Sequence, residues 1–237
     1  MNLIVDIGNT RIKAAVFNES ILVEKHTFLE VGRFKEFLKD KAYDRSMISS
    51  VRSDDREIVA HIPSPKIQLT SSLDLPIKVN YDTPKTLGVD RIAAACGAFE
   101  LFPGSDCLVI DMGTCITYDF LSSKGVFEGG AIAPGVKMRF AAMNHFTSRL
   151  PLVDPVADAM LTGKSTATSM QSGVINGILE EIKGFISRYQ SHYPGLKTVA
   201  CGGDLVFFEN SIKPSIFAAP ELVLTGLNRI LLHHING

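Results

Sequence analysis

The sequence predicts an α/β protein made of two related domains in tandem, and three observations support this. The stretch LIVDIGNT, residues 3–10, places an aspartate and a nearby glycine at the end of an apolar strand. The stretch CLVIDMGT, residues 107–114, repeats that arrangement. Each stretch opens a run of three strand-like segments followed by helices and further strands. Because the same order of elements occurs twice, we expect one domain over residues 1–104 and a second over residues 105–237.

The elements of the first half follow from apolar patterns and turn residues. Phe34, Phe37 and Leu38 have the spacing of one helix face. Four prolines between residues 63 and 84 keep the middle of this half from forming one long element. We expect, in order, strands over 2–7, 11–17 and 21–29, a helix around 34–38, a strand over 46–51, a short helix over 54–61, strands over 66–70 and 77–81, and a helix over 88–102.

The second half restarts with the same kinds of element. Three strands separated by short turns come first, and a polar turn at residues 122–125 separates the last two of them. The stretch KTVACGGD predicts a buried strand near the end of the chain. We expect strands over 107–112, 115–121 and 126–133, helices over 136–146 and 165–193, a strand over 197–204 and a final helix over 221–234.

The composition excludes several classes of protein. Hydrophobic residues make up 46% of the chain, which is enough for a substantial core, and the formal net charge of −1 gives no electrostatic footprint for nucleic acid. No apolar run reaches the roughly 18 residues of a membrane span, and no basic segment of a secretory signal precedes the first strand. The four cysteines form no CxxC pair, so we expect reduced thiols in a cytoplasmic protein and no zinc site.

The two aspartate-glycine turns predict a site for phosphate and metal. Backbone N–H groups of such a turn form a concavity that binds anions, and a carboxylate at the strand end can hold a cation or its water shell. Asn9, Thr10 and Thr114 add donors, and Lys13 supplies a positive charge for a phosphate. The alternative is that Asp6 and Asp111 merely begin hairpin turns, where aspartate is common. Two matched copies favour the phosphate site.

The stretch TPKTLGVDRIAAA offers a second candidate site at the start of a helix. Asp90 lies in the first turn of that helix, where the helix dipole favours an acid, so a capping role explains it when it is taken alone. The adjacent Arg91 has the planar fork that suits a carboxylate or a phosphate. Capping and ligand recognition therefore both stay open for Asp90.

Three further stretches have features of ligand-binding loops. GGAIAPG, residues 129–135, and CGGD, residues 201–204, allow a close approach of backbone to a ligand, but a tight connection between elements explains them equally well. LTGKST, residues 161–166, resembles the end of a P-loop, but Asp158 stands where that motif requires its first glycine. No GxGxxG occurs, so a Rossmann dinucleotide site has no support.

Taken together, these motifs resemble those of type III pantothenate kinases, and they occur in the same order over nearly the whole chain. The segment from Tyr81 to Arg91 is the most discriminating part of the resemblance. The wider superfamily includes acetate kinases, sugar kinases, Hsp70 and actin. The resemblance therefore implies two tandem ribonuclease H-like domains, the actin-like ATPase fold, with a nucleotide cleft between them. It also implies ATP-dependent phosphorylation of pantothenate to 4'-phosphopantothenate, the first step of coenzyme A biosynthesis.

The resemblance assigns roles residue by residue. Asp90 would be the catalytic base, Asp6 would hold magnesium, and Asp111 would bind the monovalent cation, potassium or ammonium, that these enzymes require. The residues that would contact ATP are Asp6, Ile7, Gly8, Asn9, Thr10, Arg11, Ile12, Lys13 and Thr114. The residues that would hold pantothenate are Tyr81, Gly88, Val89, Asp90, Arg91 and Thr166. Thr166 would reach the substrate at a dimer interface, so we expect a cytoplasmic homodimer that binds neither nucleic acid nor membrane.

Three alternatives remain beside this interpretation. The first is a kinase of the same superfamily that acts on a sugar or an acyl group, and the second is a regulatory relative that has lost turnover. The third is an actin-like protein that hydrolyses ATP or forms filaments, for which the chain is short. The departures from the family pattern are mild: Cys115-Ile116 replaces smaller or hydroxyl residues, and Ile92 stands where many members have Trp.

Overall fold

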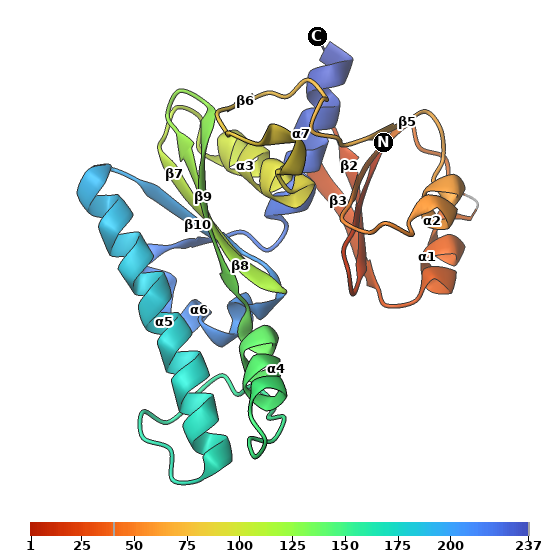
Figure 1. Cartoon of the computed structure of the whole chain (residues 1–237). Helices are drawn as coiled ribbons and strands as arrows, with labels where there is room; N and C mark the ends of the chain where they lie inside the picture. Colours follow the sequence, from red (N-terminus) through yellow and green to blue (C-terminus); the bar gives the residue numbers. More distant parts are fainter. Residues whose placement is uncertain (40, 237) are drawn as a thin grey trace. The chain divides into compact units, whose positions relative to one another are not determined.

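The computed structural model describes residues 1–39 and 41–236 of the chain and shows two compact units, each built on a β-sheet (Figure 1). The first unit comprises Met1–Gly104, the short piece Gly125–Glu128 and the C-terminal segment from Glu221. The second comprises Ser105–Lys124 and Gly129–Pro220. These units group residues by packing, whereas the predicted domains, 1–104 and 105–237, follow the order of elements, so those two ranges stay a prediction.

The sheet of the first unit has the strand order β3-β2-β1-β4-β5. Strand β1 is central: it pairs antiparallel with β2 and parallel with β4. Its residues Leu3, Ile4 and Val5 are fully buried because both of its edges and both of its faces are covered. The strands are β1 (Asn2–Ile7), β2 (Ile12–Asn18), β3 (Ile21–Phe28), β4 (Arg45–Ser50) and β5 (Lys66–Gln68).

Helices cover both faces of this sheet, and the alternation of β1 determines which side chain meets which helix. Leu3, Val5 and Ile7 point into a core with α1 (Val31–Leu38) and α2 (Arg56–His61). The alternate residues of the strand face the opposite way, toward α7 (Leu222–Asn236), which packs closely on α3 (Val89–Leu101). Asp6 therefore lies on the face of the sheet that carries α3 and α7.

The second sheet has the order β11-β10-β7-β8-β9-β6. Within the second unit, β7 pairs antiparallel with β8 and parallel with β10. The long helix α5 (Thr166–His192) lies along this sheet, and α4 (Val136–Phe146) lies beside its N-terminal half (Figure 1). The strands are β6 (Lys78–Val79), β7 (Cys107–Met112), β8 (Cys115–Ser122), β9 (Val126–Pro134), β10 (Lys197–Cys201) and β11 (Phe217–Ala218).

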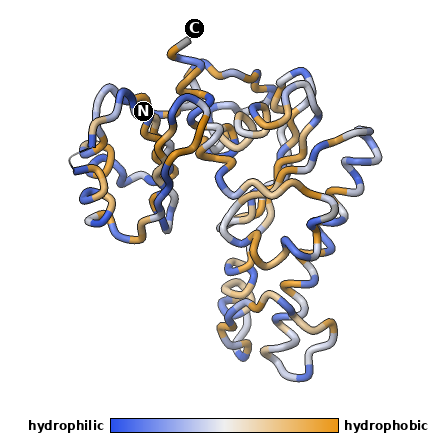
Figure 2. Tube along the Cα trace, turned by 180° about the vertical axis from the view of Figure 1, so that it is seen from behind, coloured by the Kyte–Doolittle hydropathy of each residue, from blue (hydrophilic) through white to orange (hydrophobic). Residues whose placement is uncertain are grey.

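Helix α5 has the pattern of a helix with one face on a sheet. Its hydrophobic and hydrophilic residues alternate along the tube in Figure 2. The buried apolar side chains recur every three or four residues, and they are Met170, Val174, Ile175, Ile178, Ile182 and Ile186. No helix in the described part of the chain has both the length and the apolar character needed to cross a membrane.

The predicted elements are confirmed, with corrections at some ends. The two three-stranded runs, the long helices and the strand near the C-terminus all form. The strand predicted over 197–204 was too long: it ends at Cys201, because Gly202 has φ of 95° and turns the chain into the 3-10 helix Gly203–Phe207. Five short elements were not predicted from the sequence, and they are the 3-10 helices Pro84–Thr86, Gly203–Phe207 and Lys213–Ser215, helix α6 (Glu209–Ile212) and strand β11.

Candidate active site

The first aspartate-glycine turn joins β1 to β2 and carries charged groups from two strands. Asp6 lies opposite Lys13 in the β1–β2 pair and opposite Ser49 in the β1–β4 pair. The N–H of Gly8 donates to the carbonyl of Arg11 at 3.0 Å, which closes the turn. The tip between them is exposed to solvent. The structure therefore brings Asp6 and Lys13 together, as the sequence predicted.

Asp6 is held in an environment that disfavours its charge. Burial raises the pKa of its carboxyl to about 6, Lys13 opposes that shift, and the negative charge of Asp90 adds to it. Ser49 lies beside Asp6, and its hydroxyl also lowers the pKa. The Ser49 Oγ is fully buried, yet it has no hydrogen bond of normal geometry among the described residues. A carboxyl with a raised pKa beside a second carboxylate is the arrangement that a bound cation would relieve.

The Asp6 environment predicts a pH-dependent change in stability. The folded pKa lies above the unfolded value of 3.8, so the ionised form destabilises the fold increasingly as pH rises through about 6. Asp6→Asn should therefore be more stable than the wild type by about 1–3 kcal/mol near pH 8, with the gain shrinking toward about pH 4. Urea unfolding without divalent cations measures this.

The control for that experiment is Asp54→Asn. Asp54 is exposed, and its hydrogen bonds from Arg52 lower its pKa, so its replacement should give no gain at high pH. A stability difference between Asp6→Asn and the wild type that stays the same at every pH would contradict the assignment of a raised pKa to Asp6.

Asp90 lies at the N-terminus of α3, close enough to Asp6 to raise its pKa. The N-cap position is Gly88, and the Oδ1 of Asp90 accepts a hydrogen bond from the backbone N–H of Arg91 at 2.9 Å. This carboxylate folds back over Gly88, where an added Cβ would lie 2.5 Å from Oδ1. A side chain at position 88 would require this carboxylate to shift. Asp90 therefore satisfies one backbone donor of the helix, and its charge also acts on the carboxyl of Asp6.

Arg91 and Tyr81 belong to one aromatic cluster in the first unit. The Arg91 Cζ lies 5.7 Å from the centre of the Tyr81 ring and 5.6 Å from that of Phe127. The guanidinium is buried, so these ring faces contribute a cation–π attraction in a dry environment. Pairing of the short strand β6 with β9 holds Phe127 close to Tyr81. Just after β6, Asn80 donates its backbone N–H to the Phe127 carbonyl and its side-chain amide to Glu128.

The second aspartate-glycine turn joins β7 to β8 in the second unit. Gly113 donates to the Cys115 carbonyl at 2.9 Å, and Gly135 donates to the Thr114 carbonyl at 3.1 Å. An added Cβ at Gly135 would overlap the backbone of Gly113 and Thr114. The GGAIAPG segment is therefore packed directly on the turn, and its last glycine is required for that approach.

The CGGD segment packs against the end of β7 that leads into the same turn. Cys201 pairs with Asp111 across β10 and β7. An added Cβ at Gly202 would overlap the Met112 carbonyl oxygen and lie 2.5 Å from the Asp111 Oδ1. The Asp111 carboxylate oxygen and the Met112 carbonyl oxygen therefore both lie close to Gly202, which has no side chain. Oxygen atoms of these two kinds are the ligands that hard cations prefer.

The predicted pantothenate residues are divided between the two units. Tyr81 and the segment 88–91 belong to the first unit, and Thr166 belongs to the second. Thr166 is the first residue of α5 and is exposed. The helix start is well defined, because Ser165 is its N-cap and forms a reciprocal capping box with Thr168.

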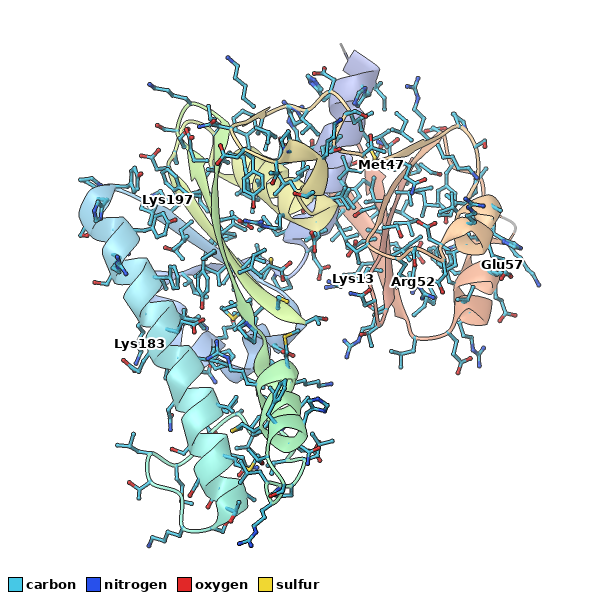
Figure 3. All side chains as sticks on the ribbon, viewed as in Figure 1. Lys13, Met47, Arg52, Glu57, Lys183 and Lys197 are labelled. Carbon is cyan, nitrogen blue, oxygen red and sulfur yellow. The ribbon has the colours of Figure 1, made fainter. Side chains whose placement is uncertain are left out.

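Three residues near the first turn or in the aromatic cluster of Arg91 have no motif in the sequence, and they are Ser49, Arg52 and Phe127. Ser49 and Arg52 come from β4 and the loop after it, and Val51 in that loop donates to the Ile7 carbonyl at 3.2 Å. Arg52 is fixed by two hydrogen bonds to Asp54, at 2.8 and 2.7 Å, and lies near the same end of the sheet as Lys13 (Figure 3). The third residue, Phe127, contributes one of the two rings beside the Arg91 guanidinium. No local motif marks these residues, since strand pairing alone brings them to the site.

Comparisons with known proteins identify the family of this chain. The family model described as type III pantothenate kinase matches residues 2–188. A type III pantothenate kinase of Cytophaga hutchinsonii is 43% identical, over 99% of this chain and 100% of the relative. One from Christiangramia forsetii is 44% identical, over 98% of both chains.

Solved structures support the fold. A Campylobacter jejuni protein described as a Baf family transcriptional activator matches with a TM-score of 0.68 at 24% identity, over 99% of this chain and 100% of that one. The activator of 2-hydroxyisocaproyl-CoA dehydratase from Clostridium difficile, solved with bound ADPNP, matches with a TM-score of 0.52 at 11% identity, over 100% and 97% of the two chains. At these identities the structures show a shared fold alone. The family model and the relatives above 40% identity show that this chain belongs to the type III pantothenate kinase family.

Proposed function

We propose that this chain transfers the γ-phosphoryl group of ATP to the primary hydroxyl of pantothenate, giving 4'-phosphopantothenate for coenzyme A synthesis. The observation that carries the proposal is the position of Asp90 beside Asp6. Helix α3, which packs on α7 and β4, brings a carboxylate suited to accept a proton next to a turn suited to hold phosphates. Phosphoryl transfer needs these two functions at adjacent positions.

The first turn and Thr114 bind ATP in this proposal. The N–H groups of residues 9–11, at the exposed tip of the turn that the Gly8 N–H closes, and the ammonium of Lys13 bind phosphate oxygens. Magnesium fits at Asp6, because one or two carboxylates with phosphates and waters suffice for this ion, and the described residues contain no cluster of three metal-ligating side chains. Bound there, the ion would neutralise charge that develops on the phosphate oxygens. The monovalent cation fits the oxygen pair formed by Asp111 and Met112.

Asp90 and its neighbours act on pantothenate in this proposal. Asp90 accepts the proton of the hydroxyl as the hydroxyl oxygen attacks phosphorus. Arg91 is suited to the pantothenate carboxylate, because a buried guanidinium held by aromatic rings is already desolvated and oriented. Tyr81 forms one wall of the same cluster. Thr166, at the start of α5, contacts the substrate in this proposal.

The experiment that tests this function is a coupled ADP-release assay with ATP, magnesium and potassium. We expect ADP formation that depends on added pantothenate and is absent with acetate or hexoses. Turnover with a sugar or acetate instead would indicate another kinase of the superfamily. ATP binding without any turnover would indicate a regulatory relative, and either result would overturn the proposal.

We also propose that the working unit is a cytoplasmic homodimer. The four cysteines are free, which suits a reducing compartment. Around the start of α5, the second unit exposes large apolar side chains, with Leu161 at 85%, Leu152 at 68% and Phe146 at 82% exposure. A twofold contact would bury the same patch on both subunits.

Leu161→Glu tests the dimer. We expect it to shift the chain toward monomer in light scattering and to lower turnover of pantothenate, because a buried charge opposes association. Ile21→Glu is the matched control, since Ile21 is 69% exposed on β3 of the first unit. A wild-type monomer that is fully active at assay concentrations would refute the dimer as the working unit.

A further inference from the structure

A charged network in the second unit joins β8, α4 and α5 through Tyr118, Arg139 and Glu181. The carboxylate of Glu181, on α5, accepts two hydrogen bonds from different elements. The Tyr118 hydroxyl on β8 donates to its Oε1 at 2.9 Å, and the Arg139 Nη2 on α4 donates to its Oε2 at 2.8 Å. Both charged side chains are about three-quarters buried, at 23% and 28% exposure. A partly buried carboxylate with two donors is a specific contact rather than a loose surface pair.

The guanidinium of Arg139 donates to two different acceptors. Besides Nη2 on Glu181, its Nε donates to the backbone carbonyl of Pro134 at 2.9 Å. Pro134 is the last residue of β9, and α4 begins two residues later. One side chain thus ties the end of a strand to the middle of α5. A lysine would have to reach both acceptors from one nitrogen, whereas the guanidinium reaches them from two nitrogens held in one rigid plane.

The junction that Arg139 holds is the one that contacts the second aspartate-glycine turn. Gly135, between Pro134 and α4, donates its N–H to the Thr114 carbonyl at 3.1 Å and lies against the backbone of Gly113 without room for a Cβ. The path from Glu181 to Thr114 therefore consists of two hydrogen bonds from Arg139, one peptide unit, and one hydrogen bond from Gly135.

We propose that Arg139 and Glu181 are positioning residues for ATP binding: through Pro134 and Gly135 they fix the turn that carries Thr114. This rests on the proposed contact of Thr114 with ATP. Neither residue touches the nucleotide in this account. A displaced junction would move the Thr114 backbone, so nucleotide affinity would fall while the proton-accepting carboxylate and the aromatic cluster of the first unit keep their own contacts.

The simpler alternative is that the network only stabilises the second unit. Tyr118 is fully buried, its ring stacks on Phe185 with centres 4.0 Å apart, and its hydroxyl needs an acceptor. Tyr118→Phe removes the bond to Glu181 but leaves both bonds of Arg139. Arg139→Lys keeps a positive charge near Glu181 but loses the fork. The two variants therefore separate stability from positioning.

The experiment measures nucleotide affinity by calorimetry with a non-hydrolysable ATP analogue, the two KM values, and the melting temperature. We expect Arg139→Lys to weaken nucleotide binding and to raise the KM for ATP about tenfold, with the KM for pantothenate changed less than about twofold. Tyr118→Phe should lower the melting temperature and leave nucleotide affinity unchanged. Arg139→Gln should weaken binding at least as much as Arg139→Lys.

Two results would overturn the positioning role. One is nucleotide affinity of Arg139→Lys within twofold of the wild type. The other is a loss of nucleotide affinity in both Arg139→Lys and Tyr118→Phe that is proportional, in each variant, to its fall in melting temperature. Binding of the analogue to the wild type does not require pantothenate, so failure of this proposal and failure of the proposed kinase activity give different results.

Discussion

Asp90→Asn should fold and bind ATP normally, yet turn over pantothenate at least about a hundred times more slowly. Asparagine keeps the size of the side chain and can still accept the hydrogen bond from Arg91, so the start of α3 is preserved. It cannot take the hydroxyl proton, and loss of a general base costs roughly 10²–10⁴-fold in rate. Steady-state kinetics beside nucleotide calorimetry measure both properties.

The matched control is Asp55→Asn, since Asp55 is the N-cap of α2 and has no side-chain cap hydrogen bond. It should change turnover less than about twofold. A loss below about tenfold for Asp90→Asn, with chemistry shown to be rate-limiting, would return Asp90 to the helix-capping role that its position also permits.

Activity should collapse when potassium and ammonium are replaced by sodium or a bulky organic cation, and it should return when potassium is added. The expected basis is the pair of oxygens from Asp111 and Met112 beside Gly202. Asp111→Asn removes the charge from this pair, so we expect turnover to fall about ten- to a hundredfold, with a flattened potassium response. Potassium titrations of both proteins measure this.

Asp204→Asn is the comparison for that experiment, because Asp204 follows the same glycine pair but lies in the 3-10 helix beyond it. It should keep the potassium response of the wild type. Full wild-type activity without any potassium or ammonium, or an unchanged potassium response in Asp111→Asn, would contradict the cation assignment.

Much of the fold was predictable because the strands and long helices have strong local patterns. Strand β7 and helix α4 form over the predicted ranges, since apolar runs bounded by turn residues specify them locally. The short elements after Gly202 were not predictable. Their conformation depends on a positive φ at one glycine and on packing against the β7–β8 turn, and neither leaves a periodic pattern.

The site was predictable where its residues are close in sequence. Asp6 and Lys13 are brought together by a hairpin, and Asp90 and Arg91 are neighbours, so motifs reveal them. The network of Tyr118, Arg139 and Glu181 has no such signal, because its members are separated by more than twenty residues and meet only through tertiary packing.

The identity of the product tests most directly whether this chain phosphorylates pantothenate. The purified protein is incubated with ATP, magnesium, potassium and pantothenate, and the mixture is analysed by mass spectrometry and phosphorus NMR. We expect pantothenate that has gained one phosphoryl group as a monoester on its primary hydroxyl, in amounts equal to the ADP formed. Unmodified pantothenate accompanied by ADP and free phosphate, or by no ADP, would contradict the proposed function.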